Sequence, residues 1–170
     1  MSSKADLGIR HVLPVYPLLF LLVGYAISKC QKWRYVFVAL FIWLLAVMIA
    51  AYPYYISYFN NLAGGSYNGY KITNDSNLDW GQDLPRIASY IKNNNLKNIY
   101  IDYAWDGGSA LDYFLGKGDY KLLSDWSAGD GGYAIINSSD FDTSTQYKYL
   151  QSCFGLKQVT PSVFICQLPK

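Results

Sequence analysis

The stretch Asp75–Asp83 (Asp-Ser-Asn-Leu-Asp-Trp-Gly-Gln-Asp) concentrates side chains that could do chemistry. Carboxylates and amides accept and donate hydrogen bonds, and an indole ring can cover the apolar C–H surface of a sugar. This combination predicts a binding site for sugar hydroxyls or a lipid headgroup. The side chains that we expect to take part are Asp75, Asn77, Asp79, Trp80 and Gln82.

Part of the same stretch also fits the start of a helix. Asp79 followed three positions later by Gln82 has the form of a capping box. Asp83 precedes Leu84-Pro85 and fits an N-cap, because proline is well tolerated in a first turn. Each cap contributes about 1 kcal/mol. The sequence leaves open whether the stretch binds a ligand or only shapes the chain.

A divalent cation is a further alternative for these residues. Asp75, Asn77 and Asp79 occupy the first, third and fifth positions of a calcium loop. Such a loop needs Gly at its sixth position and a bidentate Glu at its twelfth, where Trp80 and Arg86 stand. An EF-hand is therefore excluded, and a looser cation site stays open. We expect no other cofactor.

Arg10 and His11 form a second candidate site, just before the first long apolar run. A guanidinium can hold a phosphate through two hydrogen bonds, and His11 could add another. An anchor at a membrane interface explains the pair equally well. Because His11 is the single histidine, no Ser-His-Asp or Cys-His set can be assembled in the C-terminal half, and no catalytic residue is assigned.

These candidate sites flank two long apolar segments. Val12–Ser28 is apolar or small apart from two tyrosines, and Tyr35–Tyr52 carries no charge. A membrane-spanning helix needs about 17 to 25 such residues. We therefore predict a hairpin of two transmembrane helices within residues 12–52, preceded by an external approach segment, 1–11. Two buried core helices are the alternative.

The loop between the two segments, 29–34, predicts their orientation. It contains Lys29, Lys32 and Arg34 and no acid, and short basic loops lie on the cytoplasmic side. Residues 1–11 and everything after Tyr52 are then extracytoplasmic, in a multi-pass protein of the cell membrane. The net charge of +2 is small and gives no reason to expect nucleic acid as a partner.

The part after Tyr52 has the pattern of an external linker, 53–83, followed by a small extracytoplasmic α/β domain, 84–170. Apolar positions recur at helical spacing from Leu84, and strand-like runs alternate with helical ones, which favours a small sheet with parallel pairs covered by helices. The expected helices are Leu84 to Asn93–Asn95, Ser109–Leu115, and one from Asp140 or Asp142 to about Cys153. The expected strands are Asn98–Ala104, Gly132–Asn137 and Ser162–Leu168.

The cysteines give information on the cellular compartment of the C-terminal half. Cys30, Cys153 and Cys166 lack the spacing of zinc ligands, so no structural metal site is predicted. If the C-terminal half is extracytoplasmic, Cys153 and Cys166 can pair as a disulfide. Two buried thiols are the alternative.

Three motifs in order along the chain are Gly8–Pro17 (GIRHVLPVYP), Tyr58–Asn60 with Gly64-Gly65, and Asp75–Leu84. Together they resemble the C-terminal part of bacterial phospholipid-carrier-dependent glycosyltransferases, which are polytopic relatives of the dolichyl-phosphate-mannose protein mannosyltransferases. The resemblance covers about residues 8–90 and continues more weakly to the end of the chain, where Pro161–Ile165 is similar to a strand of the family.

The resemblance implies an enzyme that moves a sugar from a polyprenyl-phosphate donor to an acceptor outside the cytoplasm. Arg10 and His11 match the family's membrane-edge motif, which implies a contact with the carrier phosphate. The family's catalytic carboxylate lies in a first external loop that has no counterpart in these 170 residues. We therefore expect a C-terminal fragment, a split gene product or a decayed relative, which is inactive without a separate N-terminal membrane subunit.

Two other functions stay open at this point. One is a non-enzymatic membrane-anchored module that binds a glycan or a lipid headgroup, and the other is a structural membrane subunit. Membrane lipid and a lipid-linked sugar are the expected partners.

Overall fold

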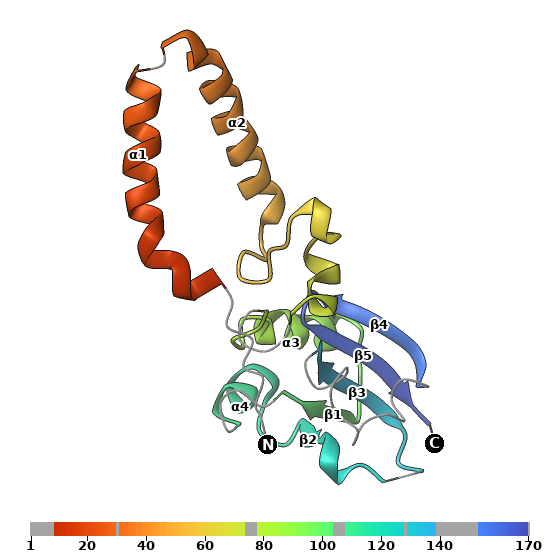
Figure 1. The fold of residues 1–170 in the computed structure, drawn as a ribbon. Coiled ribbons are helices and arrows are strands. Elements are labelled where there is room, and N and C mark those ends of the chain that lie inside the picture. The colour runs from red at the N-terminus through yellow and green to blue at the C-terminus, as the bar shows by residue number, and fades with distance from the viewer. Residues whose placement is uncertain are drawn as a thin grey trace. The chain divides into compact units, whose positions relative to one another are not determined.

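The computed structural model describes residues 9–29, 31–73, 78–103, 108–127, 129–138 and 153–169. The chain divides into two compact units, Met1–Tyr55 and Ile56–Lys170 (Figure 1). The first unit is helical and the second is a mixed α/β domain.

Two apolar helices make up the first unit. The 3-10 helix η1 (Ile9–Val15) leads into α1 (Tyr16–Lys29), and η2 (Gln31–Trp33) leads into α2 (Arg34–Ala51). Pro14 lies in η1, so the regular α-helix begins at Tyr16 instead of the predicted Val12. Neither α1 nor α2 buries a residue, so the alternative of two buried core helices does not hold within this chain. Both are long and apolar enough to cross a membrane.

A five-stranded sheet organises the second unit, in the order β2-β1-β3-β5-β4. β1 (Ile99–Asp102) pairs in parallel with β2 (Tyr120–Leu122) and with β3 (Gly132–Asn137). β5 (Val163–Leu168) is antiparallel to β3 and to β4 (Phe154–Thr160). The predicted parallel pairs are therefore confirmed, and two antiparallel strands extend them into a mixed sheet.

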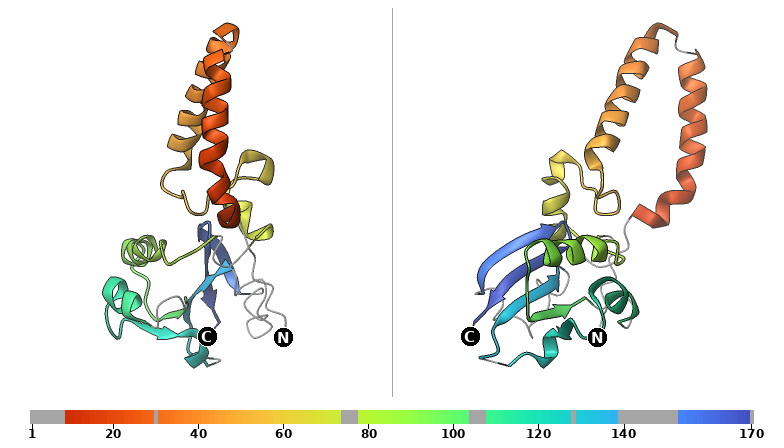
Figure 2. Two further views of the ribbon diagram at one scale, coloured as in Figure 1. Left: turned by 60° about the vertical axis from the view of Figure 1, so that its left-hand side comes forward. Right: turned by 180° about the vertical axis from the view of Figure 1, so that it is seen from behind.

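The two α-helices of this unit, α3 (Leu84–Asn93) and α4 (Ser109–Leu115), lie on one face of the sheet (Figure 2). Side chains alternate between the two faces of a strand, so Ile99 and Ile101 point towards α3 and α4, while Tyr100 points to the other face. The core on the helical side consists of Leu84, Ile87, Ile99, Ile101, Tyr103, Leu111, Ile135, Val163 and Ile165. The core on the other side consists of Tyr100, Leu123, Ala134, Ile136, Cys166 and Leu168, with Leu123 supplied by the short helix η6 (Leu123–Asp125).

Most of the predicted elements occur close to their expected bounds. The helices at Leu84 and Ser109 and the strands β1, β3 and β5 are confirmed. The helix expected from Asp140 or Asp142 lies outside the described residues, apart from its end at Cys153. The strands β2 and β4 were not predicted. β2 is very short, and β4 includes Gly155 and lacks a regular alternation of buried and exposed residues.

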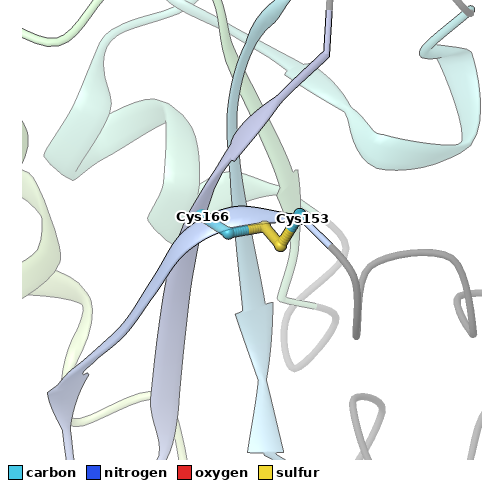
Figure 3. Close-up of a disulfide and its surroundings, with 2 residues drawn as sticks. All are labelled: Cys153 and Cys166. Carbon is cyan, nitrogen blue, oxygen red and sulfur yellow. A yellow bond between two sulfur atoms is a disulfide. The ribbon is translucent and has the colours of Figure 1, made fainter.

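Cys153 and Cys166 form a disulfide next to the start of β4 (Figure 3). Their Cα atoms lie 5.9 Å apart, and Cys166 is on the sheet face away from α3 and α4. Of the two alternatives for these cysteines, the structure selects pairing.

Most of the segment expected to be an external linker packs with the α/β domain, since the second unit begins at Ile56. It contains two short 3-10 helices, η3 (Asn61–Ala63) and η4 (Ser66–Lys71).

Candidate functional site

The described part of the Asp75–Asp83 motif is Leu78–Asp83, a turn that leads into α3; Asp75 and Asn77 lie outside the described residues. The backbone N–H of Gly81 donates to Asp79 Oδ1 at 2.7 Å, and that of Trp80 donates to Gln82 Oε1 at 2.6 Å. Gly81 has a φ of 86°, a conformation that favours glycine. Two polar side chains of the motif therefore bind its own backbone.

Asp79 is buried, with an exposed fraction of 1%. The Tyr103 hydroxyl lies 2.7 Å from both carboxylate oxygens, and Asn137 Nδ2 donates to Oδ2 at 2.8 Å. Tyr103 directly follows β1 and Asn137 ends β3. The carboxyl ends of the parallel strands β1 and β3 lie at the same end of the sheet, which brings Tyr103 and Asn137 close together. The turn before α3 adds Asp79, so three residues from distant parts of the sequence meet.

Asp83 is buried in a second, neighbouring network. Its Oδ1 pairs with Arg86 Nη1 at 2.8 Å, and its Oδ2 accepts a hydrogen bond of 2.8 Å from the hydroxyl of Ser162, in the turn between β4 and β5. The motif is thereby connected to the β4–β5 turn as well as to α3.

The predicted N-cap position at Asp83, with Pro85 in the first turn, is confirmed, but the predicted capping hydrogen bonds are wrong. Asp83 stands at the N-cap position of α3, but its side chain makes no capping hydrogen bond, because the carboxylate is directed to Arg86 and Ser162. Asp79 and Gln82 do not form a capping box, because α3 begins only at Leu84 and Gln82 binds the amide of Trp80.

Burial raises the pKa of Asp79 above its ordinary value of 3.8. Hydrogen bonding by Ser162, Tyr103 and Gly81 opposes this shift, and the nearby Asp83 adds to it. The pKa of Tyr103 is also raised, first by burial and then by the Asp79 charge. Tyr103 therefore stays a hydrogen-bond donor to the carboxyl group.

Trp80 is the part of the described motif that reaches the surface, with 58% of it exposed. Its backbone is fixed by Gln82, whose Nε2 in turn donates to the carbonyl of Leu78 at 3.0 Å and to the hydroxyl of Ser57 at 3.3 Å. The ring of Trp80 thus stands on a rigid turn. An indole held in this way can cover the C–H face of a sugar or a lipid headgroup.

A hollow of about 580 Å³ lies at the carboxyl ends of β1 and β2, and Tyr103 forms part of its wall. Its other polar side chains are Asp102, Asp112, Tyr120, Lys121 and Asp125. Asp112 accepts a hydrogen bond of 2.9 Å from the Tyr120 hydroxyl. The network around Asp79 therefore adjoins, through Tyr103, a hollow at the carboxyl ends of parallel strands, where ligands bind in many open α/β sheets.

The other sequence-predicted residues are placed less fully. Arg10 and His11 belong to η1, which directly precedes α1, and only their backbone is described. Among the described residues, no group of three or more His, Cys, Asp or Glu could hold a metal ion. Asp79 is engaged by Tyr103, Asn137 and Gly81.

Sequence reasoning did not single out Tyr103, Asn137 or Ser162. The available signal was their position, since Tyr103 and Asn137 stand at or just after the ends of strands and Ser162 follows Pro161 between two strands. Polar residues at the carboxyl ends of parallel strands meet at one edge, but their partner in a distant turn cannot be read from spacing.

Comparison with known proteins gives no relative for this chain. No family model, no curated protein and no solved structure matches it.

Proposed function

We propose that this chain is the membrane-anchored C-terminal part of a glycosyltransferase that uses a polyprenyl-phosphate sugar donor at the extracytoplasmic face. The observation that carries the proposal is the order of three motifs: Arg10-His11 before the first apolar helix, Tyr58–Asn60 after the second, and Asp75–Asp83 before α3. That order resembles the phospholipid-carrier-dependent glycosyltransferases.

The membrane anchor is the hairpin of α1 and α2. Helices that are apolar all round and bury nothing within their own chain need an apolar solvent, which a bilayer supplies. Lys29, Lys32 and Arg34 at the turn of the hairpin favour a cytoplasmic position for that turn.

The disulfide is an independent argument for the same orientation. Disulfides persist in oxidising compartments and are rare in the cytosol. The Cys153–Cys166 pair therefore supports an extracytoplasmic location of the second unit. The basic turn and the disulfide agree, although they come from different units of the chain.

The two candidate sites then have different tasks. Arg10 and His11 precede α1, at the end of the hairpin opposite the basic turn, where a carrier phosphate would meet the membrane surface. In the Asp75–Asp83 motif, Asp79 and Gln82 hold the turn, and Trp80 presents its ring to the sugar or the acceptor. No residue of this chain is assigned as catalytic.

The carrier contact can be tested by photo-crosslinking in vesicles that contain the full chain. The probe is a polyprenyl phosphate with a diazirine near its phosphate end. We expect labelling of the chain, and a severalfold loss of labelling in Arg10→Ala/His11→Ala. The matched control is Lys32→Ala/Arg34→Ala, which removes charge from the opposite end of the hairpin and should leave labelling unchanged. Equal loss in both double variants would show non-specific attraction to charge and refute a carrier site.

Sugar transfer is the second test. Membranes that contain this chain together with the product of the gene directly upstream should consume a radiolabelled polyprenyl-phosphate sugar, and membranes with either protein alone should not. Consumption that is independent of this chain would contradict the proposal.

A non-enzymatic glycan-binding module is the second candidate, and the exposed ring of Trp80 on its rigid turn favours it. It predicts that the chain retains polyprenyl-phosphate-linked or free glycans without any partner. Trp80→Ala should abolish this retention, while Tyr113→Ala, at an exposed tyrosine of α4, should not. If the two variants retain glycans equally, this candidate fails.

A further inference from the structure

The segment from Ile56 to Thr73 exposes large apolar side chains from an ordered structure. They are Ile56, Tyr58, Leu62, Tyr67 and Ile72, here called the apolar rim. Leu62 is 99% exposed and Ile72 is 60% exposed. An exposed leucine is common on proteins, but several large apolar groups within one short segment indicate a surface that contacts something apolar.

Several polar side chains of this segment form hydrogen bonds within the segment itself. Asn60 Oδ1 accepts from the amide of Ala63 at 2.9 Å and caps η3, and Asn68 Nδ2 donates to the carbonyl of Gly64 at 2.9 Å. Lys71 Nζ donates to Asn68 Oδ1 at 2.8 Å. Asn60, Asn68 and Lys71 are therefore engaged within the segment, while Leu62 and Ile72 are exposed. This arrangement suits an environment that offers few hydrogen bonds.

Contacts within the segment and with strands β4 and β5 hold it in place. Gly69 is buried under the ring of Phe59, with no space for a Cβ atom. Gln158 Nε2, on β4, donates to the carbonyl of Tyr67 at 3.0 Å. The ring of Tyr70 packs edge-on against Phe164 of β5, with 5.1 Å between ring centroids. The exposure of the rim is thus a property of the folded domain.

The position of the segment in the chain indicates what the rim contacts. Ile56 follows the end of α2 at Ala51 so closely that the connecting residues reach at most about 18 Å when extended. Lys71 is the single charged residue of 52–73, and the segment is rich in tyrosine. Tyrosines with few charges are typical of the interface between lipid headgroups and acyl chains.

From these observations we infer that the apolar rim inserts into the outer interface of the same membrane that α1 and α2 cross, and so docks the external domain on the lipid surface. The inference rests on the proposed membrane crossing. It assigns Leu62 and Ile72 as the deepest anchors, and it leaves Phe154, an exposed apolar residue at the start of β4, in water.

The test uses the full chain with Cys30→Ser and single labelling sites for an environment-sensitive nitrobenzoxadiazole fluorophore, with the Cys153–Cys166 disulfide kept intact. The chain is placed in phosphatidylethanolamine/phosphatidylglycerol vesicles with spin-labelled lipids. Labels at Leu62→Cys and Ile72→Cys should show blue-shifted emission and quenching by spin labels near the headgroup, because interfacial groups lie about 5–10 Å deep.

Two control sites separate this inference from the proposal beneath it. A label at Phe41→Cys, in the middle of α2, should be quenched by spin labels deep in the acyl chains, and a label at Phe154→Cys should not be quenched. If the label at Phe41 is quenched but the labels at Leu62 and Ile72 are quenched no more than the label at Phe154, the docking surface is refuted and the membrane crossing still holds. Absence of quenching at Phe41 overturns the membrane crossing itself.

A charge at the rim gives a second, independent readout. Leu62→Glu should weaken the quenching of a label at Ile72, with no change in thermal stability, because Leu62 makes little contact with the domain. Phe154→Glu is the matched control and should leave that quenching unchanged. Undiminished quenching at Ile72 in Leu62→Glu would count against the rim as the docking surface.

Discussion

The buried contact between Asp79 and Tyr103 makes a double-mutant cycle the most informative measurement on the folded domain. Tyr103 donates its hydroxyl to both oxygens of the carboxyl group at 2.7 Å, and Asn137 Nδ2 donates to one of them at 2.8 Å. The cycle consists of Asp79→Ala, Tyr103→Phe and the combination of both.

The expected energies follow from the groups that each change leaves behind. Asp79→Ala removes the acceptor of two buried donors, and each loss costs about 1–3 kcal/mol, so we expect the free energy of unfolding to fall by about 3–4 kcal/mol. Tyr103→Phe removes one donor to the carboxyl group and should cost about 1.5–2 kcal/mol. In the double variant no hydroxyl is left without its acceptor, so it should cost about as much as Asp79→Ala alone, which gives a coupling energy of about 1.5–2 kcal/mol.

Thermal and denaturant unfolding of the purified chain in detergent micelles, followed by tryptophan fluorescence, measures these differences. One kcal/mol corresponds to roughly 4 °C in Tm for a unit of this size, so Asp79→Ala should lower Tm by roughly 12 °C or more. Tyr113→Phe, at an exposed tyrosine of α4, is the control and should leave Tm unchanged. If the two single changes add to within about 0.5 kcal/mol, the contact is not an energetic unit and the reasoning is refuted.

Three further outcomes are expected. Burial raises the pKa of Asp79 above 3.8, so between 3.8 and the folded pKa the folded state binds a proton that the unfolded state has lost. The free energy of unfolding of the wild type, relative to that of Asp79→Asn, should therefore decline as pH rises through this range. A difference that does not change with pH would contradict the burial argument. Cys153→Ser/Cys166→Ser should lower the free energy of unfolding by about 3 kcal/mol in denaturant melts, since the bridge closes a short loop, and an unchanged midpoint would show that the bridge is dispensable. Gly69→Ala should cost about 1–3 kcal/mol because its Cβ has no space, whereas the control Gly24→Ala has nothing within 4 Å and should not lower Tm; equal Tm values would refute the packing.

Local pattern was enough to predict the elements that bury one clear face. The two apolar segments, the helix at Leu84 and the strand Gly132–Asn137 follow from runs and periodicities within a few residues. The two strands that were not predicted, β2 and β4, lie at the two edges of the sheet. An edge strand pairs with a neighbour on one side only, so a weak strand pattern in its sequence is tolerated there.

The candidate site could be predicted only in part from local sequence pattern. The sequence identified Asp79, Trp80 and Gln82 as unusual neighbours, but it could not tell a buried side chain from an exposed one within a single turn. Trp80 faces outwards while Asp79 is enclosed, because Tyr103 and Asn137 arrive from the ends of β1 and β3.

By itself, then, the sequence determined the division into an apolar helical hairpin and a small α/β domain, since both depend on composition and on the spacing of apolar residues. Only the tertiary structure decided which groups of the Asp75–Asp83 motif are structural, that Cys153 pairs with Cys166, and that Leu62 and Ile72 stay exposed on a braced segment. The physical reason is that hydrogen bonds, disulfides and burial depend on partners far away in the chain, and the packing of the sheet brings these partners together.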